Sequence, residues 1–221
     1  HSGRVLTIAT VNVNGIRAAI RRGMAAWFTT AQPDVLLLQE LRAPKALVEN
    51  ELRTFLGPDW HITSVESLVK GRSGVAVATR LPVLAVREAL PDLGTADAPI
   101  AEPESDSGRW IEVDLELPDA RVLTVISTYL YSGTVGTPSM EAKYAHLDRV
   151  TARLIELGTP GRLAVVSGDI NIAHTELDIK NWKGNLKAAG FLPQERAYLD
   201  RWYGELEWVD LARAAQPGVA G

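Results

Sequence analysis

The sequence predicts an α/β sandwich, in which two mainly antiparallel sheets pack face to face and helices cover their outer faces. Three observations lead to this prediction. Short apolar runs bounded by Gly, Pro and Asp recur along the chain, as expected of strands. Segments with helical periodicity stand between some of these runs. Between residues 60 and 130, however, the runs follow one another with no room for crossover helices, which disfavours a strictly alternating βαβ fold.

The composition is that of a globular protein with a large core: of the 221 residues, 46% are hydrophobic and 23% charged. We expect a single domain at residues 4–221, with His1-Ser2-Gly3 as a tag or processing remnant. The absence of cysteine excludes disulfides, thiolate metal sites and a cysteine nucleophile. The longest apolar runs are too short to span a bilayer. We expect no membrane partner. We also expect a monomer and a cytoplasmic location, in a bacterial-type cytosol or nucleoid.

The first third of the chain predicts two strands with a helix between them. Residues 4–14 alternate apolar and polar side chains and end in Asn-Gly, as a buried strand does when it runs into a turn. A helix should follow at about residues 18–30. Gln32-Pro33-Asp34 ends that helix, and residues 35–40 then form a short buried strand that carries two polar residues at its end.

The rest of the chain predicts six further strands and three helical segments. Helical spacing is present at residues 47–56, 141–157 and 194–202, whereas residues 177–189 and the Gly-Phe-Leu-Pro break after them have no single assignment. The predicted strands span residues 60–65, 74–79, 83–89, 110–117, 122–130 and 162–166. The last strand runs directly into Ser-Gly-Asp-Ile-Asn at residues 167–171. No linker separates these elements.

Polar side chains stand at three strand ends, after the apolar runs. They are Asn12 and Asn14, then Gln39-Glu40, then Asp169 and Asn171. Mg²⁺ prefers oxygen ligands and is usually held by one or two carboxylates together with water and substrate phosphate. Such a metal can polarise a phosphoryl oxygen while a second carboxylate accepts a proton from the attacking water. Glu40 suits the first role and Asp169 the second.

Each of these motifs alone has a structural explanation. Asn-Gly is a common turn, a Glu after a strand is often a solvated loop residue, and Gly168-Asp169 can form a turn or a helix N-cap. Tyr129 can be a core aromatic residue. The order in which the motifs occur along the chain is what favours an active site.

That order resembles the exonuclease III and abasic-site (AP) endonuclease family of the endonuclease/exonuclease/phosphatase superfamily, over residues 4–214. Residues 10–18 (TVNVNGIRA) look like the family's opening strand, residues 33–40 (PDVLLLQE) like its metal-ligand strand, and residues 71–76 (GRSGVA) like its substrate-facing turn. Later motifs stand in the same order. They are Gly108-Arg109, Thr128-Tyr129, residues 168–173 (GDINIA), residues 181–185 (NWKGN) and residues 190–196 (GFLPQER).

The resemblance implies a four-layer αββα sandwich and a Mg²⁺ cofactor, for which Mn²⁺ can substitute. Glu40 would be the principal metal ligand, with Asn12 and Asn14 nearby, and Asp169 and Asn171 would hold metal and activate or orient water and phosphate. Tyr129 would contact the scissile phosphate. The residues expected to grip DNA, by contacts that position a duplex without reading its sequence, are Arg17, Arg22, Arg72, Lys143, Asn181 and Lys183.

The activity that the resemblance implies is hydrolysis of the phosphodiester 5′ to abasic sites in duplex DNA, with 3′→5′ exonuclease action and cleaning of 3′-blocked ends, in base excision repair. The family continues with an Arg-Ile-Asp-Tyr-like segment and a Ser-Asp-His loop, and neither occurs after Asp210. We therefore expect the domain to be incomplete at its C-terminus. Two alternatives stay open: an inactive truncated chain that binds DNA or a partner, and a phosphatase of the same superfamily acting on another phosphoester.

The net charge of −4 argues against indiscriminate binding to polyanions, because phosphate backbones are held by clustered Lys and Arg. Local clusters can still supply such contacts. Basic residues gather at residues 17–22 and again at residues 180–187, whereas acidic residues dominate from 88 to 116. We expect the surface to be polarised.

Overall fold

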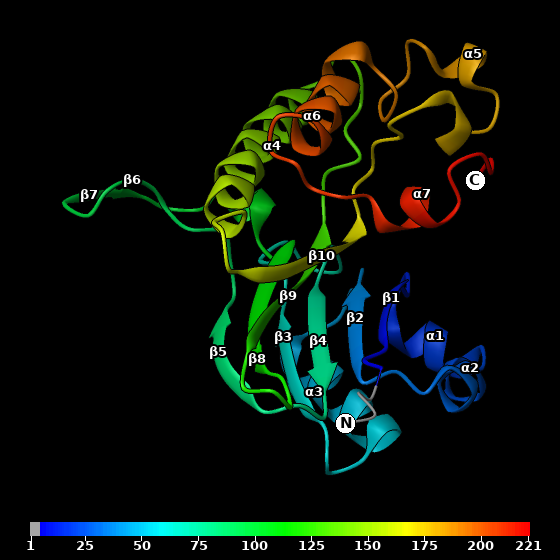
Figure 1. Cartoon of the computed structure of the whole chain (residues 1–221), viewed down its shortest axis with the longest axis vertical. Coiled ribbons are helices and arrows are strands. Elements are labelled where there is room, and N and C mark those ends of the chain that lie inside the picture. Colours follow the sequence, from blue (N-terminus) through cyan, green and yellow to red (C-terminus); the bar gives the residue numbers. More distant parts are fainter. Residues whose placement is uncertain (1–4) are drawn as a thin grey trace. The chain divides into compact units, whose positions relative to one another are not determined.

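Two four-stranded mixed sheets dominate the computed structural model, which describes residues 5–221 (Figure 1). The predicted processing remnant at residues 1–3 lies outside the described residues. The chain divides into two compact units. The first consists of the residues up to Tyr129 together with Arg162–Asp169, and the second of Leu130–Gly161 and Ile170–Gly221. Both sheets belong to the first unit.

The first sheet has the strand order β1-β2-β4-β3. β1 (Ile8–Asn12) and β2 (Val35–Gln39) are parallel, whereas β4 (Val75–Thr79) is antiparallel to both β2 and β3 (His61–Val65). A parallel pair needs a crossover connection. The segment between β1 and β2 supplies it.

The second sheet repeats this arrangement, in the order β10-β9-β8-β5. β10 (Leu163–Asp169) is parallel to β9 (Val122–Tyr129), and β8 (Trp110–Glu116) is antiparallel to both β9 and β5 (Val83–Arg87). Each sheet thus contains one parallel and two antiparallel pairs. The prediction of mainly antiparallel sheets is confirmed.

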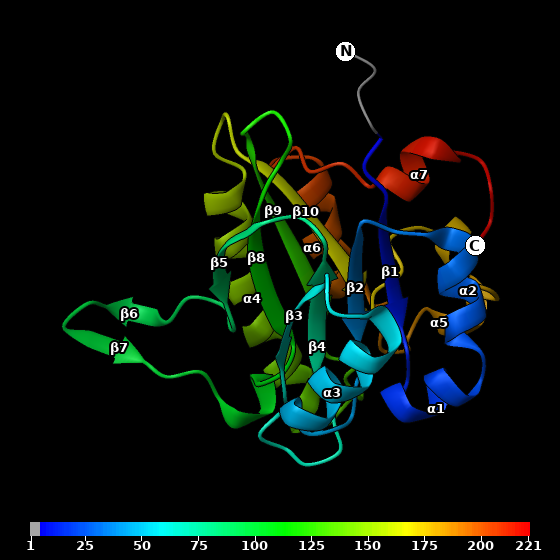
Figure 2. The ribbon, with the colours of Figure 1, turned by 90° about the horizontal axis from the view of Figure 1, so that it is seen from below.

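The alternation of side chains along β2 builds two cores. Val35 and Leu37 face the second sheet, where they form a buried cluster with β4 residues and with Ile111, Val113 and Val125. Leu36 and Leu38 point the other way, against the helices α1 (Ile16–Arg21), α2 (Met24–Ala31) and α3 (Lys45–Leu56). The first unit is therefore a sandwich of two sheets with helices outside (Figure 2), as predicted.

Two features of the first unit differ from the prediction. The helix expected at residues 18–30 is two helices, because Gly23 adopts a left-handed conformation (φ 99°) that ends the first one. In addition, the connection from β5 to β8 contains an unpredicted hairpin, β6 (Leu93–Thr95) and β7 (Ala98–Ile100), followed by the short 3₁₀ helix η1 (Glu104–Asp106). The hairpin projects away from the two sheets (Figure 1).

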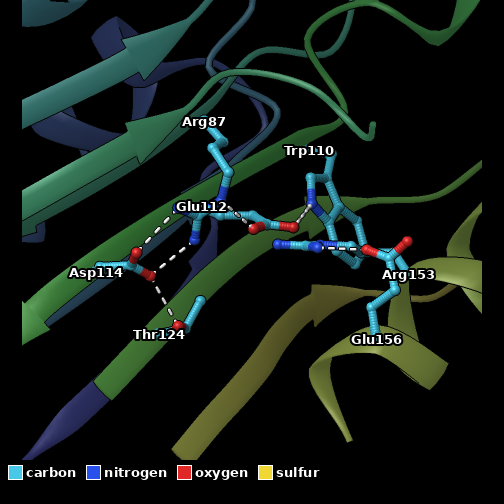
Figure 3. Close-up of polar contacts among 7 residues, drawn as sticks. All are labelled: Arg87, Trp110, Glu112, Asp114, Thr124, Arg153 and Glu156. Carbon is cyan, nitrogen blue, oxygen red and sulfur yellow. Dashed lines mark hydrogen bonds and ion pairs between the residues drawn. The ribbon is translucent and has the colours of Figure 1, made fainter. Parts of the chain in front are cut away.

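The second sheet carries a polar network on the face opposite its apolar core. Trp110, Glu112 and Asp114 alternate along β8 with the buried apolar residues. Arg87 donates from Nε to fully buried Glu112 (2.6 Å) and from Nη1 and Nη2 to Asp114 (2.9 and 2.7 Å), as Figure 3 shows. Trp110 Nε1 donates to Glu112 (2.9 Å), and the Thr124 hydroxyl donates to Asp114 (2.7 Å).

The second unit is helical. Its two principal helices are α4 (Pro138–Leu157) and α6 (Pro193–Tyr203). A hydrogen bond from Trp202 Nε1 to Thr151 Oγ1 (2.8 Å) joins them. The region from residue 177 to residue 189 contains only short turns of helix. The shorter elements of this unit are η2 (Glu176–Asp178), α5 (Trp182–Asn185) and α7 (Leu211–Ala215). None of the helices in residues 5–221 is both long and apolar enough to cross a membrane.

Candidate active site at the strand ends

The candidate site lies in the first unit, where two pairs of parallel strands end. Parallel strands present their carboxyl ends at the same edge of a sheet. In the first sheet Asn12 is the register partner of Gln39, so Asn12 and Glu40 lie next to one another. In the second sheet Asp169 is the register partner of Tyr129. The fold thus brings together four of the residues predicted from the sequence.

Asn12 joins the two carboxylates directly. Its Nδ2 donates to Glu40 Oε1 (2.7 Å) and to Asp169 Oδ2 (3.1 Å), although these residues lie in different sheets. Its Oδ1 accepts a hydrogen bond from the backbone N–H of Asn14 (3.0 Å), which fixes the orientation of the amide. One amide nitrogen therefore sets the spacing between Glu40 and Asp169.

The backbone around these residues adopts conformations that few side chains tolerate. Glu40 has φ 50°, and its carbonyl accepts the N–H of Gly15 (2.7 Å). Gly168 has φ 146°, and a Cβ atom at that position would lie only 1.9 Å from the Thr128 carbonyl oxygen. Only glycine permits β10 to approach β9 so closely. Asp169 is held at the end of β10 as a consequence.

Gln39 forms a polar contact between the sheets one residue before Glu40. It is buried, and its Nε2 donates to Ser127 Oγ in the second sheet (3.0 Å) and to Thr10 Oγ1 in the first (3.1 Å). The Ser127 hydroxyl in turn donates to the carbonyl of Leu38 (2.7 Å). We call Gln39, Ser127 and Thr10 the inter-sheet clip. It lies next to Glu40 in one sheet and two residues from Tyr129 in the other.

Two arginines complete the site, and neither was among the predicted site residues. Arg42 donates from Nε (2.9 Å) and from Nη2 to Glu40 Oε2. Arg109 lies over the ring of Tyr129 at 5.3 Å from its centroid and donates from Nη1 to the Tyr129 carbonyl (3.3 Å). The sequence offered one signal for Arg109, since Gly108-Arg109 is among the motifs that carry the resemblance.

The environment of Tyr129 favours its protonated form. Burial raises the pKa of the phenol, and the nearby carboxylates of Glu40 and Asp169 raise it further, against the opposing effects of Arg109 and Arg42. The hydroxyl therefore carries its proton at neutral pH. It can donate a hydrogen bond to an anionic oxygen such as that of a phosphate.

The donor set of the site fits a hard divalent cation. In the part of the chain that the structure describes, no three His, Cys, Asp or Glu side chains are grouped to hold a metal. Mg²⁺ does not need such a group, because one or two carboxylates, water and substrate phosphate are enough. Glu40 and Asp169 supply the two carboxylates. Among the described residues, no hydrogen bond links the Asn14 side chain to either of them.

Asn171 and Lys143 belong to the second unit. The Asn171 side chain donates to the Leu130 carbonyl (2.8 Å), and its own carbonyl accepts from Lys143 Nζ (2.9 Å). Lys143 is fully buried and donates also to the carbonyl of Ser132 (3.0 Å) and to Glu195. The expectation that Lys143 grips DNA is wrong, because all three N–H groups of its ammonium are used inside the protein.

The other predicted DNA contacts lie on the surface. Arg17 is on α1 and Arg22 follows its last residue, while Arg72 lies in the loop between β3 and β4. In the second unit Asn181 precedes α5, and Lys183 lies 5.4 Å above the ring of Trp182. All five of these residues are exposed, so each is available to a ligand.

Comparisons with known proteins identify relatives over nearly the whole chain. A profile of the Endonuclease/Exonuclease/phosphatase family matches residues 9–218. The chain is 28% identical, over 98% of its length, to a DNA-(apurinic or apyrimidinic site) endonuclease of Dictyostelium discoideum, and 28% identical over 95% to an exodeoxyribonuclease of Bacillus subtilis. The solved structure of an AP endonuclease from Archaeoglobus fulgidus superposes with a TM-score of 0.80 at 25% identity, covering 97% of this chain.

The chain is shorter than these relatives. It spans 55% of the Dictyostelium protein, 75% of the Bacillus protein and 76% of the Archaeoglobus chain.

Proposed function

Because the chain belongs to the endonuclease/exonuclease/phosphatase family, we propose that it acts as a DNA repair nuclease that hydrolyses phosphodiester bonds. The observation that carries this proposal is the bridge that Asn12 forms between Glu40 and Asp169, beside a protonated Tyr129. This arrangement combines a cation site with a proton acceptor and a hydrogen-bond donor. The names of the relatives support DNA as the substrate.

In the finer form of the proposal, the protein cuts 5′ to abasic sites in duplex DNA, removes nucleotides in the 3′→5′ direction and cleans 3′-blocked ends. In the first unit, exposed Arg17, Arg22 and Arg72 would hold the phosphate backbone. In the second unit, exposed Asn181 and Lys183 are proposed, separately, as phosphate contacts. We further propose that the protein is a cytoplasmic monomer.

Each residue at the strand ends has a role in this mechanism. Glu40, with Asp169 and the neighbouring amides, would hold Mg²⁺, which supplies Lewis-acid polarisation of the scissile phosphate. The carboxylate of Asp169 accepts the proton of the attacking water. The Tyr129 hydroxyl donates to a phosphate oxygen as negative charge builds up on it. Asn12 keeps the two carboxylates at a set spacing, and Asn171 would orient the water and phosphate.

The test is incision of a duplex oligonucleotide that carries one abasic-site analogue, with Mg²⁺ and with EDTA. We expect incision only with Mg²⁺. Glu40→Ala and Asp169→Asn should each lower the rate by about 10³-fold or more, and Tyr129→Phe by about 10²-fold, as for loss of one transition-state hydrogen bond. Asp119→Asn is the control, because Asp119 is an exposed residue that pairs with Arg121.

Other outcomes would change the assignment. Incision that persists in EDTA or in Glu40→Ala would refute the proposed site. Salt-sensitive binding of the duplex without any cleavage would identify the chain as a DNA-binding protein without catalysis. Release of inorganic phosphate from an inositol phosphate, without attack on DNA, would assign it to the phosphatases of the family.

A further inference from the structure

The loop between β3 and β4 exposes two apolar side chains between charged residues. Leu68 is 71% exposed and Val69 38% exposed. Exposed Lys70 and Arg72 follow them directly, and neither forms an ion pair within the described part of the chain. A single exposed Leu is ordinary on a protein surface. An exposed apolar pair beside two cations can contact bases and phosphates at the same time.

Two hydrogen bonds tether the backbone of this loop. The backbone N–H of Leu68 donates to Ser107 Oγ (2.8 Å), and that of Val69 donates to Ser67 Oγ (3.1 Å). The loop also packs tightly on Gly108, where a Cβ atom would lie 2.6 Å from the backbone nitrogen of Ser67. Leu68 is therefore presented to solvent by a braced backbone, and little conformational entropy is lost when it binds.

The base of the loop is attached to the candidate active site. The N–H of Leu41 donates to the carbonyl of Gly74 (3.0 Å), and the N–H of Arg42 donates to the carbonyl of Ser73 (2.9 Å). Leu41 and Arg42 immediately follow Glu40. The base of the loop, at Ser73 and Gly74, thus lies beside the site within the first unit.

We propose that Leu68, supported by Val69, is a wedge that enters the base stack of duplex DNA next to the phosphodiester to be cut, while Lys70 and Arg72 contact the flanking phosphates. This inference rests on the proposed function. Proteins that deform DNA insert apolar side chains of this kind between base steps. An abasic site lacks one base and leaves an apolar gap in the stack, which a Leu side chain can fill with burial of its own surface. The wedge would favour such sites over intact duplex.

The experiment uses the 221-residue chain and a duplex with 2-aminopurine next to an abasic-site analogue, in Ca²⁺ so that cleavage does not proceed. The fluorescence of 2-aminopurine rises when the base is unstacked. We expect a rise on binding of the wild type and of Leu68→Met, and little rise for Leu68→Ala, which should bind about tenfold more weakly. Leu84→Ala is the matched control, because Leu84 is 52% exposed on β5, in the other sheet.

Salt dependence separates the wedge from the phosphate contacts. We plot the logarithm of the association constant for DNA against the logarithm of the salt concentration. Leu68→Ala should leave the slope of this plot unchanged, whereas Lys70→Ala and Arg72→Ala should each reduce its magnitude by about one. A fluorescence rise in Leu68→Ala equal to that of the wild type would overturn the wedge and leave the nuclease proposal intact. If the wild type binds no duplex even at low salt, the DNA function itself fails. Loss of a dimer in Leu68→Ala, seen by sedimentation with fluorescence unchanged, would assign Leu68 to a contact between two copies instead.

Discussion

Asn12 and Gln39 are uncharged amides that organise the candidate active site. Asn12 bridges two carboxylates by donating from one nitrogen, so it holds them together without adding a positive charge that would compete with a cation. Arg42, in contrast, places a full charge against Glu40. The inter-sheet clip acts through Gln39, which uses both its donor and its acceptor capacity in a buried position.

The inter-sheet clip predicts that Gln39 positions the neighbouring Glu40. Gln39→Leu removes buried hydrogen bonds and should lower the free energy of unfolding by about 1–3 kcal/mol. Because Gln39 precedes Glu40, the substitution should also weaken Mn²⁺ binding by about tenfold or more, measured by electron paramagnetic resonance.

The matched control for Gln39→Leu is Thr79→Val. Thr79 is a buried hydroxyl residue at the far end of the antiparallel β2–β4 pair, where it donates to the Asp34 carbonyl (3.2 Å) and accepts from the Leu81 N–H. The Thr79→Val variant should lose a similar amount of unfolding free energy and keep the Mn²⁺ affinity of the wild type. Equal Mn²⁺ affinity in both variants would show that the clip stabilises the sandwich and does not position Glu40.

At the scale of elements, a buried ion pair organises the second unit. Lys143 on α4 contacts the segment after β9 through Ser132, the segment after β10 through Asn171, and α6 through Glu195. Glu195 also accepts the N–H groups of Gly190 (2.8 Å) and Leu192 (3.2 Å), which caps the start of α6. One pair of side chains thereby joins two helices and two loops.

Removal of one partner of this ion pair should strongly destabilise the fold. Lys143→Met leaves the Glu195 carboxylate buried without its cation, and we expect the free energy of unfolding to fall by about 3–5 kcal/mol in urea denaturation. The double variant Lys143→Met/Glu195→Gln should recover part of this loss, because the amide oxygen can still cap α6. Lys45→Met, which breaks the exposed pair with Glu88, should change stability by no more than about 1 kcal/mol. A similar loss in Lys143→Met and Lys45→Met would contradict the argument.

At the scale of the whole molecule, the negative charge is concentrated in one segment. Residues 88–107 contain six acidic residues and no Lys or Arg, which leaves 21 acidic against 23 basic residues in the rest of the chain. The segment includes the projecting β6–β7 hairpin (Figure 1). The remainder is therefore slightly basic, as the proposed binding to DNA requires, even though the total charge is −4.

The stability of the chain in acid should depend on Asp114. Its hydrogen bonds with Arg87 hold the pKa of the carboxyl below the ordinary value of 3.8, against the effect of burial. A lowered folded-state pKa contributes stability that is present above pH 3.8 and is lost as the pH falls through the folded-state pKa. Asp114→Asn should therefore be less stable than the wild type at pH 7, and the difference should shrink towards zero below pH 3.8.

Chemical denaturation from pH 7 down to the acid limit would measure this difference. Asp119→Asn, which alters an exposed ion pair, should show a smaller difference in stability that is reduced by salt. A constant difference between Asp114→Asn and the wild type at every pH would show that Asp114 acts by packing alone.

Much of the fold was predictable because strand patterns are local. Alternation and buried apolar runs located all eight strands of the two large sheets, and the order of motifs indicated the family, which the comparisons confirm. The β6–β7 hairpin escaped prediction because its strands are only three residues long and every residue of β7 is exposed. The break at Gly23 depends on a backbone conformation that apolar periodicity does not report.

The candidate site was likewise predictable in part. The sequence by itself determined that Asn12, Glu40, Tyr129 and Asp169 stand at strand ends, because the strand pattern and the residue that ends it are both read locally. Only the tertiary structure decided that the amide of Asn12 joins two carboxylates, one of them 157 residues away, and that Lys143 is buried against Glu195 and cannot reach DNA. A charged side chain is exposed or buried according to its partners, and those partners lie far along the chain, where no local pattern can report them.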